Sequence, residues 1–210
     1  MINSGQSCIA AKRFIVEKPV LKEFISHLKT HLLALRTGDP LDETTQYGPL
    51  ARPDLADELT QQVEDTVLKG AKIELYGGQS KPGTTLFRPM FLSNIRPGQR
   101  AYSEELFGPV ALVLEAKNAN DAVRLANDSR FGLGAAVWTK DAKKGEAMAR
   151  QIESGAVFVN GIVKSMSELP FGGVKKSGYG RELSYLGIRE FVNQKSIWIG
   201  TGVIQNVKTE

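Results

Sequence analysis

Residues 3–8 (NSGQSC) end in Cys8, the only cysteine of this 210-residue chain. A thiol becomes a nucleophile when backbone N–H groups at a helix start, or nearby cations, stabilise its thiolate. Lys12 and Arg13 follow Cys8 closely, and the segment after Cys8 is compatible with a helix. We therefore predict a reactive thiol. The alternative is a buried cysteine that acts as a small, inert hydrophobic residue, although the preceding glycine and polar residues argue against an apolar site.

The composition bounds the class of protein. With 41% hydrophobic and 24% charged residues, the chain has a globular composition and enough length for one packed domain. A single cysteine excludes an intrachain disulfide, which fits a reducing, cytoplasmic location. The basic residues are scattered among 23 acidic ones, so the net charge of +4 indicates a mildly basic surface and no nucleic-acid partner. No apolar run approaches the ~18 residues of a membrane span, so no membrane association is expected.

Strands and helices alternate along the chain. The continuous apolar run at 109–114 is typical of a strand buried on both faces, and 13–17 is a shorter candidate strand. Apolar residues at helical spacing predict a helix over 19–35. A second helix is expected to begin near Pro53 and to end at Lys69-Gly70. Further strands are expected at 72–76, 87–92, 135–138 and 156–160, and further helices at 120–127, 142–152 and 183–191. This alternation predicts an α/β fold with a mainly parallel sheet and helices on both faces.

The pattern changes in the last third of the chain. A loop at 161–180 carries five glycines, and connections of that length are uncommon unless they have a function. Residues 195–199 (KSIWI) are expected to form a terminal strand. An apolar strand at the end of a chain can leave an exposed edge, and exposed edges favour pairing with another chain. We therefore expect a homo-oligomer.

Two other patterns do not support a cofactor or metal site. Residues 132–137 (GLGAAV) lack the third glycine of a dinucleotide-binding fingerprint and lead into a predicted strand instead of a helix. His27 and His31 are spaced to share a helix face, but no third ligand is evident. We predict no metal site and expect both histidines to be exposed to solvent.

Three segments resemble, in order, the signature segments of the aldehyde dehydrogenase superfamily: 3–8 (NSGQSC), 104–110 (EELFGPV) and 170–182 (PFGGVKKSGYGRE). The resemblance covers nearly the whole chain, and three motifs in a fixed order rarely arise by accident. Residues 11–16 (AKRFIV) and 171–178 (FGGVKKSG) are most similar to bacterial succinate-semialdehyde dehydrogenases. The resemblance implies that 1–200 form the catalytic domain of this family and that 201–210 are a carboxyl-terminal tail.

The resemblance also implies roles for single residues. Cys8 matches the nucleophile that attacks the aldehyde carbon to form a thiohemiacetal, passes hydride to NAD or NADP, and leaves a thioester for water to hydrolyse. Its backbone N–H would help to hold the oxyanion. Glu105 matches the carboxylate that binds the hydroxyls of the nicotinamide ribose, and Phe107 matches an aromatic beside that part of the cofactor. From composition alone, Phe107 would be a core aromatic, and Glu104 is expected to be a solvated neighbour.

Glu182 matches a carboxylate that is sometimes proposed to relay protons. An ion pair with Arg181 or Lys175 is the structural alternative. The glycines around it are expected to permit backbone conformations that other residues avoid.

The expected substrate is an aldehyde, succinic semialdehyde by the subfamily resemblance. Some members of that subfamily place an arginine six residues before the nucleophile to hold the substrate carboxylate, but this chain has Ile2 there. Lys164, Ser165 and Ser167 are then the candidate substrate-binding residues, because their loop lies beside the substrate entrance in the family. The alternative for all three is an ordinary exposed loop position.

The full-length enzymes of this family carry an amino-terminal cofactor-binding domain, which holds the general-base glutamate and an asparagine that contacts the oxyanion. The sequence here begins a few residues before the nucleophile. We therefore expect a catalytic domain without its cofactor domain, with little or no turnover alone. Two other functions stay open: a non-catalytic oligomerisation or binding module of the same fold, and a thiol esterase that uses Cys8 without a nicotinamide.

Overall fold

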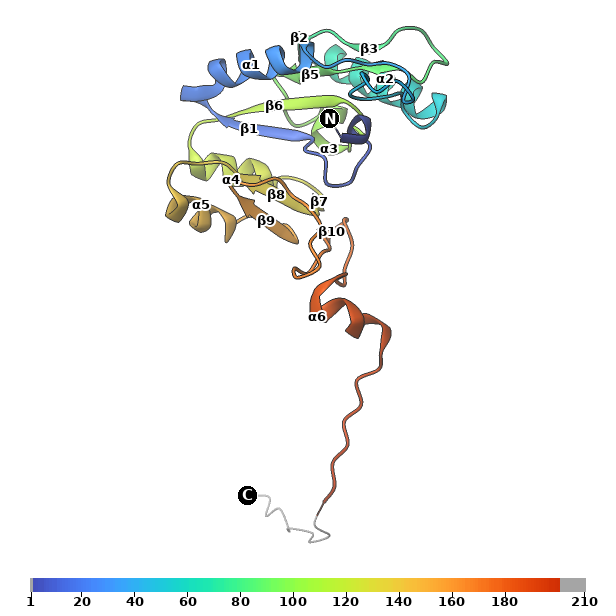
Figure 1. Cartoon of the computed structure of the whole chain (residues 1–210). Helices are drawn as coiled ribbons and strands as arrows, with labels where there is room; N and C mark the ends of the chain where they lie inside the picture. Colours follow the sequence, from blue (N-terminus) through green and yellow to red (C-terminus); the bar gives the residue numbers. More distant parts are fainter. Residues whose placement is uncertain (1, 201–210) are drawn as a thin grey trace.

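The central sheet has four strands in the order β1-β6-β5-β2 (Figure 1). The computed structural model describes residues 2–200, and the expected tail at 201–210 lies outside them. The strands are β1 (Arg13–Glu17), β6 (Val110–Ala116), β5 (Met90–Ser93) and β2 (Lys72–Leu75). β1 and β5 both pair in parallel with β6, whereas β2 pairs antiparallel with β5. The predicted, mainly parallel sheet is confirmed, with one antiparallel edge strand.

The central strand β6 explains why its sequence is an unbroken apolar run. Successive side chains of a strand point to opposite faces of the sheet. Val110, Leu112 and Leu114 belong to one buried cluster, whereas Ala111 and Val113 belong to another on the opposite face. Because helices cover both faces, every position of β6 that faces a cluster must be apolar. The predicted packing of helices on both faces is confirmed.

Four helices supply the other halves of these two clusters. They are α1 (Lys18–Leu33) on the Ala111 face and α2 (Pro53–Leu68), α3 (Arg100–Ser103) and α4 (Ala119–Asn127) on the Val110 face. A proline in the first turn begins both α1 and α2, where its missing N–H costs nothing. His27 and His31 lie exposed on α1, as expected. Among residues 2–200, no helix is both long and apolar enough to cross a bilayer.

A smaller parallel pair of strands lies on the α4 side of the main sheet (Figure 1). It consists of β8 (Gly134–Val137) and β9 (Ala156–Val159), joined through α5 (Ala142–Ala149). Two short antiparallel pairs complete the strands: β10 (Val174–Lys175) with β7 (Phe131–Gly132), and β3 (Gly78–Gln79) with β4 (Phe87–Arg88). The segment predicted as a loop at 161–180 therefore contains a short strand, β10.

The carboxyl-terminal segment differs from its prediction. After α6 (Ser184–Gly187) and the 3-10 helix η2 (Ile188–Phe191), residues 192–200 run away from the rest of the molecule (Figure 1). The predicted strand at 195–199 is wrong for this structure, because a strand needs a hydrogen-bonded neighbour and none of the described strands pairs with it. Trp198 is 89% exposed, so the apolar side chains of this segment are not covered within the chain.

Candidate active site

Cys8 lies in a tight turn between the 3-10 helix η1 (Ile2–Gly5) and strand β1. The turn is closed by a 3.0 Å hydrogen bond from the Ala10 N–H to the Ser7 carbonyl. The Cys8 thiol is exposed, so the alternative of a buried, inert cysteine is wrong. The residues at 9–12, which are compatible with a helix, form a turn and a short irregular stretch before β1, the strand predicted at 13–17. Within the described residues, no helix begins at Cys8 to stabilise its thiolate.

The polar residues before Cys8 fix the loop to the rest of the domain. The Ser4 hydroxyl donates to the Gly48 carbonyl at 2.8 Å, and the Gln6 side-chain oxygen accepts from the Ala51 N–H at 2.8 Å. Gly5 has a φ of 76° and lies so close to Gly108 that a Cβ on it would be 2.3 Å from the Gly108 oxygen. The loop at 3–8 is thus packed backbone to backbone against the segment at 104–110.

Lys12 connects the same two segments through its side chain. Its Nζ donates to the Gly5 carbonyl and, at 3.3 Å, to the Ser7 carbonyl, and it lies 4.9 Å from the centre of the Phe107 ring. Burial lowers the pKa of Lys12, while the charges of Glu105 and Cys8 raise it by less. One of the two predicted cations is therefore beside the thiol.

Arg13, the other predicted cation, points elsewhere. Its guanidinium lies 5.2 Å from the centre of the Tyr102 ring, and the Tyr102 hydroxyl donates to Asp128. Burial lowers the pKa of Arg13, and Tyr102 and Asp128 oppose this shift. Adjacent residues at the start of a strand point to opposite sides. The expectation that Arg13 assists Cys8 is therefore wrong.

The segment after α3 presents Glu105 and Phe107 on its outer side. The two side chains are exposed, whereas Leu106 between them is fully buried in the core. Phe107 is 41% exposed, so the expectation of a core aromatic is wrong, and its ring lies next to the Cys8 loop through Lys12. Within residues 2–200, no hydrogen bond or ion pair engages the Glu105 carboxylate, which leaves it open to a ligand.

Glu104 links the segment at 104–110 to the helices α2 and α3. Its carboxylate pairs with Arg100 at 2.9 Å and accepts from the Gln62 amide at 3.0 Å, and Arg100 also pairs with Asp65 of α2. These hydrogen bonds, Arg100 foremost, lower the pKa of Glu104. The expectation of a solvated Glu104 is wrong, because Arg100 on α3 and Gln62 on α2 both engage its carboxylate. Gln62 also donates to the Glu105 carbonyl at 3.4 Å, and so helps to place the residue that follows Glu104.

Thr66 of α2 caps the short helix α3 that leads into this segment. Its hydroxyl is fully buried, donates to the Gln62 carbonyl at 2.6 Å and accepts from the Ala101 N–H at 3.1 Å. We expect Thr66→Val to lower the free energy of unfolding by about 1–3 kcal/mol, because the buried Ala101 N–H loses its acceptor. Urea denaturation of the two proteins measures this difference.

The matched control for that substitution is Thr30→Val on α1. Thr30 makes the same bond to a carbonyl four residues earlier, Ser26 at 3.1 Å, but it is exposed and accepts from no other group in the described structure. Its replacement is expected to change stability by less than about 0.5 kcal/mol. Equal effects of the two substitutions would contradict the capping role of Thr66.

Glu182 lies in the carboxyl-terminal signature segment with an exposed side chain. Its backbone forms a two-bond antiparallel bridge with Phe171. The expected ion pair is wrong, because Lys175 pairs with Glu153 at 2.8 Å and the Arg181 guanidinium donates to two backbone carbonyls. Glu182 is therefore held in place through its main chain. Its carboxylate is paired with neither Lys175 nor Arg181.

The candidate substrate residues lie in the connection between β9 and β10. Lys164, Ser165 and Ser167 all have exposed side chains. In the part of the chain that the structure describes, no hydrogen bond or ion pair joins them to the Cys8 loop. Their exposure leaves them accessible to a ligand, and the structure does not bring them into contact with Cys8.

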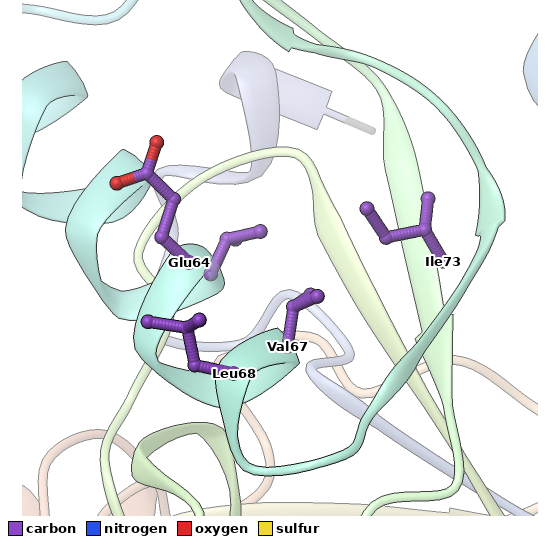
Figure 2. Close-up of a pocket in the computed structure, with 5 residues that line it drawn as sticks. Glu64, Val67, Leu68 and Ile73 are labelled. Atoms are coloured by element: carbon purple, nitrogen blue, oxygen red, sulfur yellow. The ribbon is translucent and has the colours of Figure 1, made fainter.

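A separate apolar pocket lies between α2 and β2. It has a volume of about 310 Å³ and is lined by Val63, Glu64, Val67, Leu68 and Ile73. Figure 2 shows Val67 and Ile73 on its two sides, with the Glu64 carboxylate pointing outward. No residue of the candidate active site lines this pocket, so it has no part in the site around Cys8.

Comparisons with known proteins agree with this arrangement. The sequence model for the aldehyde dehydrogenase family matches residues 1–197. A probable NADP(+) succinate-semialdehyde dehydrogenase of Synechocystis sp. is 48% identical over 201 residues, which are 95% of this chain and 44% of that protein. An NAD(P)+ succinate semialdehyde dehydrogenase of Escherichia coli is 47% identical over 197 residues, which are 93% of this chain and 42% of that protein.

Solved structures agree as well. The succinic semialdehyde dehydrogenase from Streptococcus pyogenes, in complex with NADP+, superposes with a TM-score of 0.88 at 35% identity, over 93% of this chain and 43% of that one. The betaine aldehyde dehydrogenase from Staphylococcus aureus, in complex with NAD+, gives a TM-score of 0.90 at 29% identity, over 99% and 42%. This chain thus spans less than half the length of the relatives that it matches. With the matching fold, the exposed Cys8 and the adjoining segment at 104–110, these similarities show that the chain belongs to the aldehyde dehydrogenase family.

Proposed function

We propose that this chain is the nucleophile-bearing part of an NAD(P)-dependent aldehyde dehydrogenase. The observation that carries the proposal is that the exposed Cys8 loop and the segment bearing Glu105 and Phe107 lie together, although about a hundred residues separate them. Gly5 packs against the backbone of this second segment, and Lys12 contacts both. A site for aldehyde oxidation needs a thiol nucleophile beside a bound hydride acceptor. The first segment supplies the thiol, and the second supplies residues that would hold the nicotinamide cofactor.

The Cys8 side chain carries the covalent chemistry in this proposal. Its thiolate attacks the aldehyde carbon, a C–S bond forms, and the carbonyl π electrons move to the oxygen. The Cys8 N–H makes no hydrogen bond in the described chain, so it is free to donate to that oxygen as negative charge develops. A bound NAD(P)+, held at Glu105 and Phe107, would supply the acceptor for the hydride of the former carbonyl carbon. Water then cleaves the thioester at Cys8, releases the carboxylic acid and restores the thiol.

The residues present fit the nicotinamide end of such a cofactor. The Glu105 carboxylate is exposed and unengaged within the described residues, as a group must be to accept hydrogen bonds from two ribose hydroxyls. The Phe107 ring, 41% exposed beside Glu105, offers an apolar surface for the same part of the ligand. Glu182, whose side chain is free of its two neighbouring cations, is the proposed proton relay.

Succinic semialdehyde is the proposed substrate, since two relatives at 47–48% identity carry the name succinate-semialdehyde dehydrogenase. Its carboxylate requires a cationic or hydroxyl-bearing contact, and Ile2 does not supply one. The exposed Lys164, Ser165 and Ser167 are the proposed contacts. The names of the same relatives support NADP or NAD as the cofactor.

The proposal includes a homo-oligomer in the cytoplasm. Ile197, Trp198 and Ile199 are 77%, 89% and 87% exposed. Contiguous apolar side chains of this kind favour a protein interface, and a second copy of the chain is the expected partner. The single, exposed cysteine supports a reducing compartment.

A chimera tests the proposed reaction. Residues 1–197 replace the matching segment of the Escherichia coli relative, and the product is assayed with succinic semialdehyde and either NADP+ or NAD+. We expect an increase in absorbance of the reduced nicotinamide, and little or no turnover from the 210-residue chain alone. A folded chimera that oxidises no aldehyde would contradict the proposed function. A robust rate from the chain alone would contradict the expectation that a further domain is required.

A further inference from the structure

The Lys12 side chain reaches back from the start of β1 over the loop that carries Cys8. The backbone of Lys12 is fixed to the central sheet, because its carbonyl accepts from the Leu112 N–H at 3.0 Å. From this anchored position its Nζ donates to the carbonyls of Gly5 and Ser7, three residues and one residue before Cys8. A single ammonium group thus closes the loop around the nucleophile.

The surroundings of this ammonium group are short of negative charge. The titratable groups that face Lys12 are Glu105 and Cys8, and the Phe107 ring lies 4.9 Å from its Nζ. Lys12 forms no ion pair within residues 2–200. Carbonyl dipoles and the face of an aromatic ring offset only part of the cost of burying a cation. The positive charge of Lys12 therefore acts on both the Glu105 carboxylate and the Cys8 thiol, and more strongly on Glu105.

We propose that Lys12 is a positioning residue for the reaction, which holds the Cys8 loop through two carbonyls and favours the thiolate form of Cys8 through its positive charge. The importance of Lys12 for catalysis rests on the proposed function. Its effect on the Cys8 thiol does not, because that effect can be measured in the chain alone. Lys12 touches neither substrate nor cofactor in this account. It acts only through Cys8 and through the contact with Phe107.

The expected effect on Cys8 follows from the sign of this charge. A nearby cation favours the charged form of a thiol. Lys12 provides this effect only while it is protonated, and burial lowers its pKa. Replacing Lys12 by an uncharged residue should therefore slow the reactions of Cys8 as a nucleophile.

The test is the rate of Cys8 alkylation by iodoacetamide in the purified 210-residue chain, measured at pH 7 and at pH 10. Lys12→Met removes the charge and the donors, whereas Lys12→Gln removes the charge and keeps an N–H donor. In both variants we expect the rate at pH 7, relative to the rate at pH 10, to fall about tenfold. The matched control is Lys22→Met on α1, an exposed lysine without an ion pair in the described structure, and its ratio of rates should equal that of the original chain.

Each outcome decides a different point. If both Lys12 variants keep the original ratio of rates, the electrostatic role is wrong, whatever happens to their melting temperatures. If Lys12→Met does not fold, the ratio of rates in Lys12→Gln decides alone. If the ratios fall as expected but the chimera oxidises no aldehyde, the proposed function fails and the assignment of Lys12 to the Cys8 loop stands.

Discussion

Replacing Cys8 by alanine is expected to lower the kcat of the chimera for succinic semialdehyde by about 10⁴–10⁶-fold. Alanine has no sulfur, so no bond to the aldehyde carbon can form and no thioester can follow. The thiol is exposed and does not belong to either buried cluster, so the fold should tolerate the change. The measurement is the rate of nicotinamide reduction at saturating aldehyde and cofactor.

Two observations make this result specific to the nucleophile. The melting temperature of Cys8→Ala and its affinity for NADP+ should match those of the parent chimera. Ser7→Ala is the matched control, since it removes a neighbouring hydroxyl that makes no hydrogen bond in the described chain, and it should keep most of the activity. An alanine variant with more than about one hundredth of the parent kcat would show that Cys8 is not the nucleophile.

The elements that the sequence predicts correctly are those whose patterns depend on burial. The run at 109–114 identifies the central strand β6, because a strand covered on both faces must be apolar at successive positions. The proline at 53 and the glycine at 70 bracket α2 to within two residues. These patterns are local in the sequence. The structure confirms them because neighbouring strands and helices cover the apolar residues that the patterns contain.

The wrong predictions concern residues whose structure depends on distant partners. The residues at 9–12 are compatible with a helix, but the chain turns there and enters β1, the strand predicted at 13–17, which pairs with β6. Glu104 has its ion-pair partner, Arg100, only four residues earlier, but its other partner, the Gln62 amide, lies 42 residues earlier on α2, where no local pattern points to it. The segment at 195–199 has the composition of a strand, yet no strand within residues 2–200 pairs with it.

The residues of the candidate site can be predicted because they lie in short motifs that occur in a fixed order along the chain. The contacts between these motifs cannot be predicted from the sequence. Glu105 and Phe107 could be assigned from their segment, but nothing in the sequence places Lys12 against Phe107 or Gly5 against Gly108. The sequence shows only that Lys12 lies between the Cys8 loop and the strand at 13–17. The roles that the resemblance implies for Glu105, Phe107 and Glu182 stay predictions.

Gly5→Ala is expected to cost about 2–5 kcal/mol of folding free energy and to lower the activity of the chimera by about 10²-fold. The φ of Gly5 is 76°, in the left-handed region that disfavours a side chain. A Cβ there would also lie 2.3 Å from the Gly108 oxygen and 2.6 Å from the Gly108 carbonyl carbon. Because backbone atoms cannot rotate away, the Cys8 loop and the Phe107 segment must separate. Urea denaturation and the kcat of the chimera measure the two effects.

Gly83→Ala separates the two causes of this effect. Gly83 has the same φ of 76°, but no atom lies within 4 Å of the Cβ that alanine would add. Its substitution should cost only the backbone strain, about 1–2 kcal/mol, and should leave the kcat unchanged, since no motif depends on its position. If Gly5→Ala costs no more than Gly83→Ala and keeps the parent kcat, the close approach of Gly5 to Gly108 does not hold the site together. A larger loss at Gly5 in both measurements means that contact between the two segments, and not the flexibility of a loop glycine, places Cys8 beside the cofactor residues.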